Sequence, residues 1–549
     1  MLERLVEYWL DSVNERTYQP AFVQILVSEG HRVLHSTRHA PIEFGKDVVT
    51  IAPDGVPCAY QLKGNPGGRL THGQFREMHA QIQELVLQAI AHPAAPKIVH
   101  RSFLVTNGMV EEEVQRAISD LNRSWEQMGR PANLLQIIDR GELLRRANAL
   151  GPALWPFNIR NLNAFIELLA HDGRDELPID KINVMLSAMY ELEAPDPLAR
   201  PLDLDRRVTS TAILIAVSLR NFGIRQNHFA IITAWVLYVT YTIAACERAG
   251  IAISDTIQNS IEAARQAIVT SLSDLSDEAM GKVHLIEGAG IPDAPFYHAR
   301  VALIAALMSV YWLWCNRESM TRPNIPPLEQ FLSRKPSEKC LWGEAAIPQI
   351  LAHCWYIGKK MPGHAEQFLG VILSNVLDCQ LSVSPLAPLA SPYFPVSVVV
   401  PWSLGLELNI EDHDIRGADF GHSAHFAEGL LSLVARAGLK EPCQALWRRY
   451  TMLLHQSFEV EEPWQFCLIR SERGINRSIV PQPTTLWTDL QAVAAEIATP
   501  KVPEALRGDP ILLLLFTIIA PYRATPDVVR YLGWCFSDIW LLPQAQPIP

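Results

Sequence analysis

Residues 44–64 read Phe44-Gly-Lys-Asp47-Val-Val-Thr-Ile-Ala-Pro-Asp-Gly-Val-Pro-Cys-Ala-Tyr-Gln61-Leu-Lys63-Gly64, two apolar strands joined by the turn Pro53-Asp54-Gly55. Proline opens a type I turn and glycine accepts the left-handed position, so this turn suits a three-residue hairpin loop. Counting outward from the turn places Asp47 opposite Gln61. Opposed residues in an antiparallel pair share one face, as do alternate residues along a strand. We therefore expect Asp47, Gln61 and Lys63 to project together.

These three side chains suit the hydrolysis of a phosphodiester. Magnesium takes oxygen ligands and keeps several waters, so one carboxylate plus an amide or backbone carbonyl is enough beside a phosphate. Such an ion lowers the pKa of bound water and neutralises the charge that builds on phosphorus. Lys63 then orients the attacking water or stabilises that charge as a point cation. The plainer alternative, which the hairpin alone favours, is an ordinary turn with exposed polar residues.

The flanking segments alternate between helices and strands. A helical pattern near Tyr18 ends at Gly30 and leads into a strand. After the hairpin and a further helix, residues 101–106 read as a strand that ends in a turn. A helix over 111–125 and a strand over 134–139 follow. The predicted order is therefore helix, strand, hairpin, helix, strand, helix, strand.

This order and three motifs resemble the Mrr-like branch of the PD-(D/E)XK, or restriction-endonuclease-like, superfamily. Gly45-Lys-Asp47 matches its Gly-x-Asp, Gln61-Leu-Lys63 matches its Gln-x-Lys, and Thr106-Asn-Gly108 matches its strand end. The resemblance covers residues 1 to about 150. It implies an α/β/α nuclease domain that cleaves DNA with Mg²⁺ or Mn²⁺.

The resemblance also implies a role for each residue of the hairpin site. Asp47 is a metal ligand, and the backbone carbonyl of Leu62 is a second ligand. Gln61 is either a ligand or the group that orients one. Lys63 positions the attacking water.

One position departs from the family pattern. The glutamate that the family carries on its first helix falls on Gln19, which places an amide where a carboxylate is expected. Glu15, one helical turn earlier, and Glu43, just before the hairpin, are the alternatives for that carboxylate. Amides at both Gln19 and Gln61 also fit a second hypothesis, in which a catalytically inactive nuclease fold serves as a DNA-binding or scaffolding module.

Composition describes a globular, slightly acidic chain. Its 549 residues are 49% hydrophobic and 19% charged, with a net charge of −11, so we expect about two to four domains. Nine cysteines without a Cys-x-x-Cys pair favour buried thiols in a reducing cytoplasm. Residues 1–150 carry 16 Lys and Arg against 17 Asp and Glu. DNA contact must then rely on local groups, of which Arg69 is the best candidate; a flexible surface turn is its alternative.

The rest of the chain reads as helical from Trp155 onward. We expect an α-helical domain over 151–325 and a second, mostly helical domain over 326–549, with a proline-rich boundary near 320–330. Residues 385–401 suggest a short strand or extended loop, because prolines surround a run of valines. The expected fold class is thus a multidomain α+β chain, with an α/β/α nuclease domain before a large all-α region.

Two further features carry alternatives. The uncharged segments 229–245 and 301–315 contain 17 and 15 residues, whereas a membrane span needs about 20. Buried helices of a cytoplasmic protein fit them better, and a membrane-tethered nuclease is the minority alternative. Glu411-Asp-His-Asp414, with Asp419, His422 and His425, follows no recognisable ligand pattern, and a solvated loop is favoured there.

The predicted function is a metal-dependent DNA endonuclease whose helical region senses, recruits or regulates. A role in restriction or anti-phage defence, with a partner protein of such a system, is an analogy at the level of the fold. Cleavage of both DNA strands usually requires two active sites, so a homodimer is a further expectation.

Overall fold

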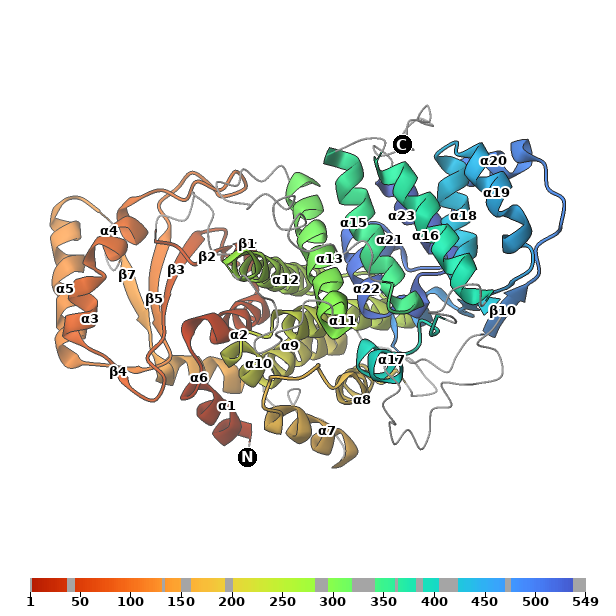
Figure 1. The fold of residues 1–549 in the computed structure, drawn as a ribbon. Coiled ribbons are helices and arrows are strands. Elements are labelled where there is room, and N and C mark those ends of the chain that lie inside the picture. Colours follow the sequence, from red (N-terminus) through yellow and green to blue (C-terminus); the bar gives the residue numbers. More distant parts are fainter. Residues whose placement is uncertain are drawn as a thin grey trace. The chain divides into compact units, whose positions relative to one another are not determined.

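The computed structural model describes residues 2–36, 45–130, 134–149, 159–192, 201–281, 295–317, 341–360, 364–381, 389–403, 423–469 and 475–536. The fold is mixed α/β and mostly helical (Figure 1). Contacts between residues divide the chain into two compact units, 1–272 and 273–549. Both predicted domain boundaries, after residue 150 and after residue 325, lie outside the described residues, so the three-domain division stays a prediction.

A five-stranded mixed sheet forms the centre of the first unit. Its first three strands pair antiparallel, and the last two continue parallel to the third. Across the sheet the order is β1 (Arg32–His35), β2 (Val48–Ile51), β3 (Pro57–Lys63), β5 (Arg101–Thr106) and β7 (Leu135–Ile138). Along the chain, the helices and strands follow the predicted order, with two short strands that were not predicted, β4 (Arg69–Leu70) and β6 (Met109–Val110).

The β2–β3 hairpin has the predicted register. Val48 pairs with Tyr60, as the turn predicts. Asp47 precedes β2, and its N–H donates to the Tyr60 carbonyl at 2.8 Å, so the regular pairing ends at Val48 and does not extend to an Asp47–Gln61 backbone pair. Gly55 in the loop takes a left-handed conformation with φ of 80°, as a three-residue loop of this kind requires. The local turn chemistry therefore determined which residues share a face.

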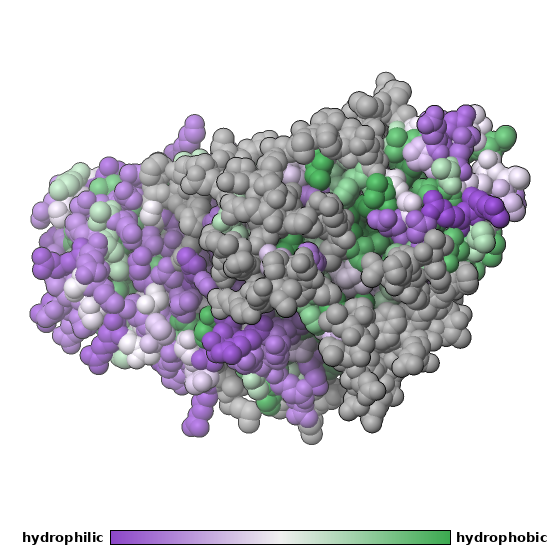
Figure 2. Space-filling model, in the orientation of Figure 1, coloured by the Kyte–Doolittle hydropathy of each residue, from purple (hydrophilic) through white to green (hydrophobic). Residues whose placement is uncertain are grey.

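Helices cover both faces of this sheet (Figure 1). One face meets α2 (Glu15–Ser28), where Phe22 lies edge-on to Tyr60. The other meets α3 (His72–Glu77), α4 (His79–Leu87) and α5 (Glu112–Gln127), whose apolar side chains form one cluster with Ala59 and Leu104. Figure 2 shows hydrophilic side chains over much of the visible surface of this region. The apolar side chains of α3, α4 and α5 are instead buried in the cluster with the sheet.

The first unit continues into a group of helices. In chain order these are α6 (Arg140–Ala149), α7 (Ile159–Ala170), α8 (Ile179–Met189), α9 (Pro201–Ser218), α10 (Arg220–Ile224), α11 (His228–Ala249) and α12 (Asp255–Gly281), of which the residues from 273 onward are assigned to the second unit. Helix α1 (Leu2–Leu10) packs on α6, and α2 packs on α9 and α10. Helix α2 is therefore enclosed between the sheet and the helical segment.

The second unit is mostly helical. Its helices are α13 (Pro295–Arg317), α15 (Ile347–Lys360), α16 (His364–Gln380), α17 (Val396–Ser403), α18 (Ala427–Arg436), α19 (Lys440–Tyr450), α20 (Trp487–Ala495), α21 (Glu504–Arg507), α22 (Pro510–Ile519) and α23 (Pro526–Cys535), with 3₁₀ turns at Glu344–Ala346, Pro463–Cys467 and Pro521–Arg523. It also contains a three-stranded sheet of β10 (Ile475–Ile479), β9 (Leu454–Glu459) and β8 (Ser423–Ala424). The expectation of an all-α region was therefore wrong for these strands.

The prediction of a strand or extended loop around the valine run was also wrong. Residues Val396–Ser403 form helix α17. The carbonyl of Pro395 accepts hydrogen bonds from the N–H groups of Val398 and Val399. Proline therefore opens this helix, which its fixed φ favours, rather than excluding one.

Two helices in the described parts of the chain are long and apolar enough to cross a membrane, namely His228–Ala249 and Phe296–Arg317. In each, most of the apolar window is buried within the protein, 89% and 78% respectively. This burial is also what core helices show, and the cytoplasmic location stays a prediction.

Candidate active site

Asp47 and Gln61 are in direct contact at the start of β2 and within β3. One carboxylate oxygen of Asp47, Oδ2, accepts a hydrogen bond from the Gln61 side-chain amide at 2.7 Å. The same oxygen accepts the backbone N–H of Leu62 at 2.7 Å. Gln61 is buried, and its Oε1 has no hydrogen-bond donor among the described residues. Asp47 and Gln61 are therefore joined through their side chains, in a hydrogen-bonded cluster with one unsatisfied oxygen.

The two residues before Asp47 fix where the strand begins. Gly45 has φ of 74°, and a Cβ there would lie 2.8 Å from the backbone oxygen of Gln81 in α4. Only glycine suits both this conformation and this close approach. Lys46 is buried, and its ammonium donates to the Glu84 carbonyl at 3.2 Å. Burial lowers the pKa of Lys46 to about 8, although the Glu84 carboxylate raises it.

Lys63 follows Gln61 on the same face of β3. Ala59 packs in the cluster under α4 and α5, whereas Tyr60 contacts α2, so alternation directs Gln61 and Lys63 to the α4 side. Lys63 is half-buried, and none of the described residues forms an ion pair with its ammonium. Its backbone carbonyl accepts the hydroxyl of Tyr18 at 3.1 Å.

Gln19 makes a different contact from the one predicted for it. It is buried on α2, and its amide donates to the Ser36 carbonyl at 2.6 Å, just beyond β1. Within the described ranges it makes no hydrogen bond to Asp47 or Gln61. The structure thus joins Asp47, Gln61 and Leu62 and leaves Gln19 outside that cluster.

The first turn of α2 nevertheless lies against the end of β3. A Cβ on Gly64 would stand 2.9 Å from the backbone nitrogen of Glu15. Glu15, one of the two alternatives for the helix carboxylate, therefore starts its helix beside the residue that follows Lys63. The other alternative, Glu43, lies outside the described residues.

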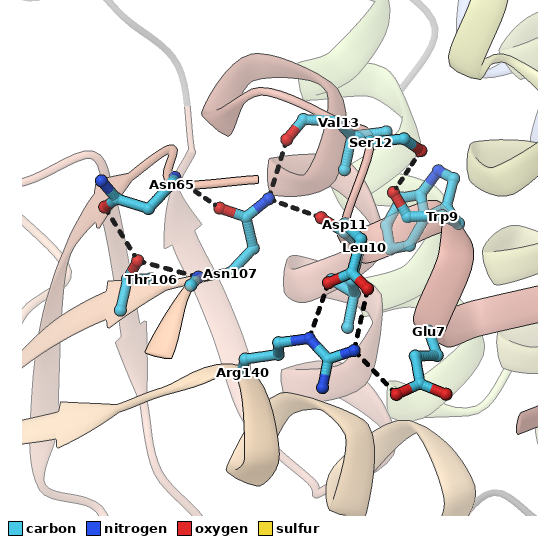
Figure 3. A network of polar contacts seen from close by, with 11 residues as sticks. Glu7, Trp9, Leu10, Asp11, Ser12, Val13, Asn65, Thr106, Asn107 and Arg140 are labelled. Carbon is cyan, nitrogen blue, oxygen red and sulfur yellow. Dashed lines mark hydrogen bonds and ion pairs between the residues drawn. The ribbon is translucent and has the colours of Figure 1, made fainter. Parts of the chain in front are cut away.

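The Thr106-Asn107-Gly108 motif holds this junction together (Figure 3). The buried Asn107 amide donates to the carbonyls of Leu10 and Val13, each at 2.7 Å, and its oxygen accepts the Asn65 N–H at 2.8 Å. Thr106 donates to the Asn65 side chain at 3.1 Å. The motif thereby ties the ends of β3 and β5 to the turn before α2, a role that sequence reasoning did not anticipate.

Arg69, the predicted phosphate contact, lies six residues after Lys63. It belongs to β4 (Arg69–Leu70), which pairs in parallel with β6 (Met109–Val110). Its side chain is exposed, whereas Leu70 is wholly buried. The backbone at Arg69 is therefore part of a paired strand, and the guanidinium is open to solvent.

The donor set at the hairpin is one of oxygens. Nowhere in the described ranges do three or more His, Cys, Asp or Glu residues gather so that they could hold a metal ion. The hairpin offers instead one carboxylate, one amide and one backbone carbonyl. A strand residue directs its N–H and its carbonyl to the same neighbour. Because the Leu62 N–H points to Asp47, the Leu62 carbonyl points to that side as well.

A second carboxylate with a similar environment was missed by sequence reasoning. Glu344, in the second unit, is fully buried and accepts the amide of Gln380 at 3.2 Å and the N–H of His425 at 3.0 Å. Burial raises the pKa of Glu344 to about 7, although both hydrogen bonds lower it. His425 belongs to the predicted polar cluster, but Glu411–His422 lie outside the described residues. No motif in the sequence marks Glu344.

Comparisons with known proteins add no relative. No family model matches the chain, and neither the curated proteins nor the solved structures contain a match. Function is therefore inferred from the residues and their geometry.

Proposed function

We propose that the chain is a metal-dependent DNA endonuclease whose active site lies on the β2–β3 hairpin. The observation that carries this proposal is the contact of Asp47 with Gln61 and Leu62 N–H, with Lys63 on the same face. The mixed sheet, with an antiparallel hairpin followed by parallel strands, supports the resemblance to restriction-endonuclease-like nucleases. DNA as substrate follows from that resemblance.

The hairpin fits a divalent cation with oxygen ligands. A buried amide oxygen without a donor costs on the order of 1–3 kcal/mol, and Gln61 Oε1 is such an atom beside the Asp47 carboxylate. A cation that contacts Asp47, Gln61 Oε1 and the Leu62 carbonyl would satisfy that oxygen. Carboxylate and carbonyl oxygens are ligands that Mg²⁺ and Mn²⁺ prefer.

The residues of the hairpin then divide the chemical tasks. The bound ion would supply a water of lowered pKa and neutralise charge on the scissile phosphate. Gln61 holds the Asp47 carboxylate in one orientation through its amide N–H. Lys63 presents an ammonium that orients the attacking water or stabilises the charge developing on phosphorus. Arg69, exposed on β4, contacts a phosphate further along the strand.

The wider roles follow from the architecture by analogy alone. The helical segments would sense or recruit, and the nuclease part would cleave, as in a restriction or anti-phage defence effector. A homodimer would supply the two active sites that double-strand cleavage needs. A partner protein of the same system and a cytoplasmic location complete the proposal.

A second candidate is a DNA-binding or scaffolding module without catalysis. It is favoured by one observation: Gln19 is committed to the Ser36 carbonyl, so it brings neither a carboxylate nor an amide to Asp47. Titration of the full chain with Mg²⁺ or Mn²⁺ separates the two candidates. A catalytic site should gain thermal stability from the ion, whereas an inactive fold should gain none.

The test of the proposed activity is nicking of supercoiled plasmid in the presence and absence of Mg²⁺ or Mn²⁺. Lys63→Met should abolish metal-dependent nicking, because the ammonium is lost while the apolar stem remains. Lys97→Met is the matched control, since Lys97 is exposed on the same unit and should leave the rate unchanged. Equal nicking by both variants would exclude Lys63 from catalysis and overturn the assignment.

A further inference from the structure

Helix α2 has two buried sides. Its residues from Tyr18 to Val27 are buried almost without interruption. One side contacts the sheet through Tyr18 and Phe22, and the other packs on α9 and α10. A change in the packing of α9 against α2 can therefore shift α2 against the sheet, because α2 is packed on both sides.

Tyr18 is the residue on α2 that contacts the end of β3. Its hydroxyl donates to the carbonyl of Lys63 at 3.1 Å and approaches the carbonyl of Val105 at 3.3 Å. Lys63 is the last residue of β3 and Val105 the last but one of β5, and the two strands are parallel neighbours. The hydroxyl thus fixes the peptide from which the Lys63 side chain leaves the sheet.

The ring of Tyr18 also faces the helical segment. Together with Ile213 and Val217 of α9, it lines a small apolar cavity of about 20 Å³ between α1, α2, α6 and α9. A void of this size leaves the packing around the ring adjustable, because a side chain can shift into it at little steric cost. Tyr18 therefore lines the same cavity as Ile213 and Val217 of α9, while its hydroxyl contacts the Lys63 carbonyl.

Two further contacts fix the position of α2 relative to the helical segment. The Gln24 amide donates to the Ser260 carbonyl of α12 at 3.0 Å, and both residues are buried. At the start of α2, a Cβ on Gly223 would lie 3.1 Å from the hydroxyl of Thr17. Thr17 directly precedes Tyr18, so α10 limits where the first turn of α2 can lie.

We propose that Tyr18 is a positioning residue for Lys63, and that α9 sets its position, so that the helical segment controls the hairpin site through α2. This inference rests on the proposed function for its effect on cleavage. Its structural content, the coupling of α9 to the end of β3, does not depend on cleavage.

The first experiment removes only the hydroxyl. Tyr18→Phe should lower kcat for plasmid nicking about tenfold and leave KM nearly unchanged. Tenfold corresponds to about 1.4 kcal/mol, which is within the range for one lost hydrogen bond. Tyr531→Phe in the second unit is the matched control, because the Tyr531 hydroxyl also donates to a backbone carbonyl, that of Arg507, at 2.8 Å. Equal rates for the two variants would overturn the positioning role.

The second experiment perturbs α9. Ile213→Val removes one methyl from the cavity wall, whereas Ile215→Val removes one from a buried residue of the same helix that does not line the cavity. Both small deletions should leave the protein folded. Ile213→Val alone should slow nicking, and it should have no further effect in the Tyr18→Phe background. Additive effects of the two substitutions would show that α9 does not act through Tyr18.

A readout without activity separates this inference from the proposed function. Amide hydrogen exchange over residues 60–66 should become faster in Tyr18→Phe and in Ile213→Val, but not in Tyr531→Phe or Ile215→Val. Wild-type protein that fails to nick DNA while showing this exchange pattern would overturn the nuclease proposal and leave the coupling standing. Unchanged exchange in all four variants would overturn the coupling.

Discussion

The two units of the chain each contain a carboxylate held by the same pair of donors. Asp47 accepts the amide of Gln61 and a backbone N–H, and Glu344 accepts the amide of Gln380 and a backbone N–H. Each glutamine also leaves its side-chain oxygen buried without a donor among the described residues. In these hydrogen bonds the two sites are alike.

They differ in exposure and in their neighbours. Glu344 is fully buried between elements that its hydrogen bonds connect, and burial raises its pKa to about 7. Asp47 is half-buried, and its partner Gln61 lies on the same face of β3 as Lys63. The difference teaches that a carboxylate–amide pair becomes a candidate for chemistry only where a substrate can reach it and a cation accompanies it.

The largest expected effect separates the two carboxylates by activity. Asp47→Asn should reduce metal-dependent nicking by at least about a hundredfold, since a ligand lost from a one-carboxylate site removes several kcal/mol of transition-state stabilisation. Glu344→Gln should leave nicking within about twofold. Rates measured on supercoiled plasmid, with folding checked by circular dichroism, decide between them. A larger loss in Glu344→Gln would reverse the roles given to the two sites.

The next effect concerns metal binding. A cation that binds only the folded chain stabilises it by about 2.7 kcal/mol at a concentration of about 100 times Kd. We expect Mn²⁺ to raise the unfolding temperature of the wild type and of Glu344→Gln, but not of Asp47→Asn. A gain that persists in Asp47→Asn would place the cation away from the hairpin.

The same comparison shows which parts of the candidate site could be predicted from the sequence. The hairpin register follows from Pro53, Asp54 and Gly55, because a turn is a local structure whose residues suffice to set it. The placement of Asp47 at the start of the hairpin, where its side chain reaches Gln61, follows from that register. This part of the candidate site was therefore predictable from about twenty consecutive residues.

Contacts between distant segments were not predictable in this way. The hydrogen bonds of Gln19 to Ser36, of Tyr18 to Lys63 and of Asn107 to Leu10 depend on how α1 and α2 dock on the sheet. Glu344 carries no local signal, because its partners lie 36 and 81 residues away. Hydrophobic periodicity and secondary-structure propensity describe single helices and strands, whereas these contacts arise from tertiary packing.

A smaller effect is the pH dependence of the second unit. Glu344 has a folded pKa of about 7, above its unfolded value of 4.5, so the folded state holds more protons between these values. The stability present below pH 4.5 is then lost as pH rises to about 7, by an amount on the order of a few kcal/mol. The free energy of unfolding of the wild type should therefore fall relative to that of Glu344→Gln as pH rises across this window. Urea unfolding at several pH values measures it, and parallel curves would contradict the raised pKa.

The smallest effect concerns Lys46, which flanks Asp47 and should show the opposite pH dependence. Its folded pKa of about 8 lies below the unfolded value of 10.5 because burial disfavours the ammonium. Between these values the unfolded chain binds more protons, so wild-type stability should rise with pH, by roughly 1–3 kcal/mol. Lys46→Met should lack this rise, whereas Lys97→Met, which changes an exposed lysine, should retain it.

The rise is also a test of how α4 holds the hairpin. If Lys46 donates to the Glu84 carbonyl from a buried position, removing its charge should flatten the curve only above pH 8 and leave the acid side, governed by Glu344, unchanged. The two windows do not overlap, so one pH series on wild type, Lys46→Met and Glu344→Gln separates them. A curve that changes on the acid side in Lys46→Met would mean that Lys46 is coupled to another titrating group, and the buried ammonium would no longer account for the alkaline rise.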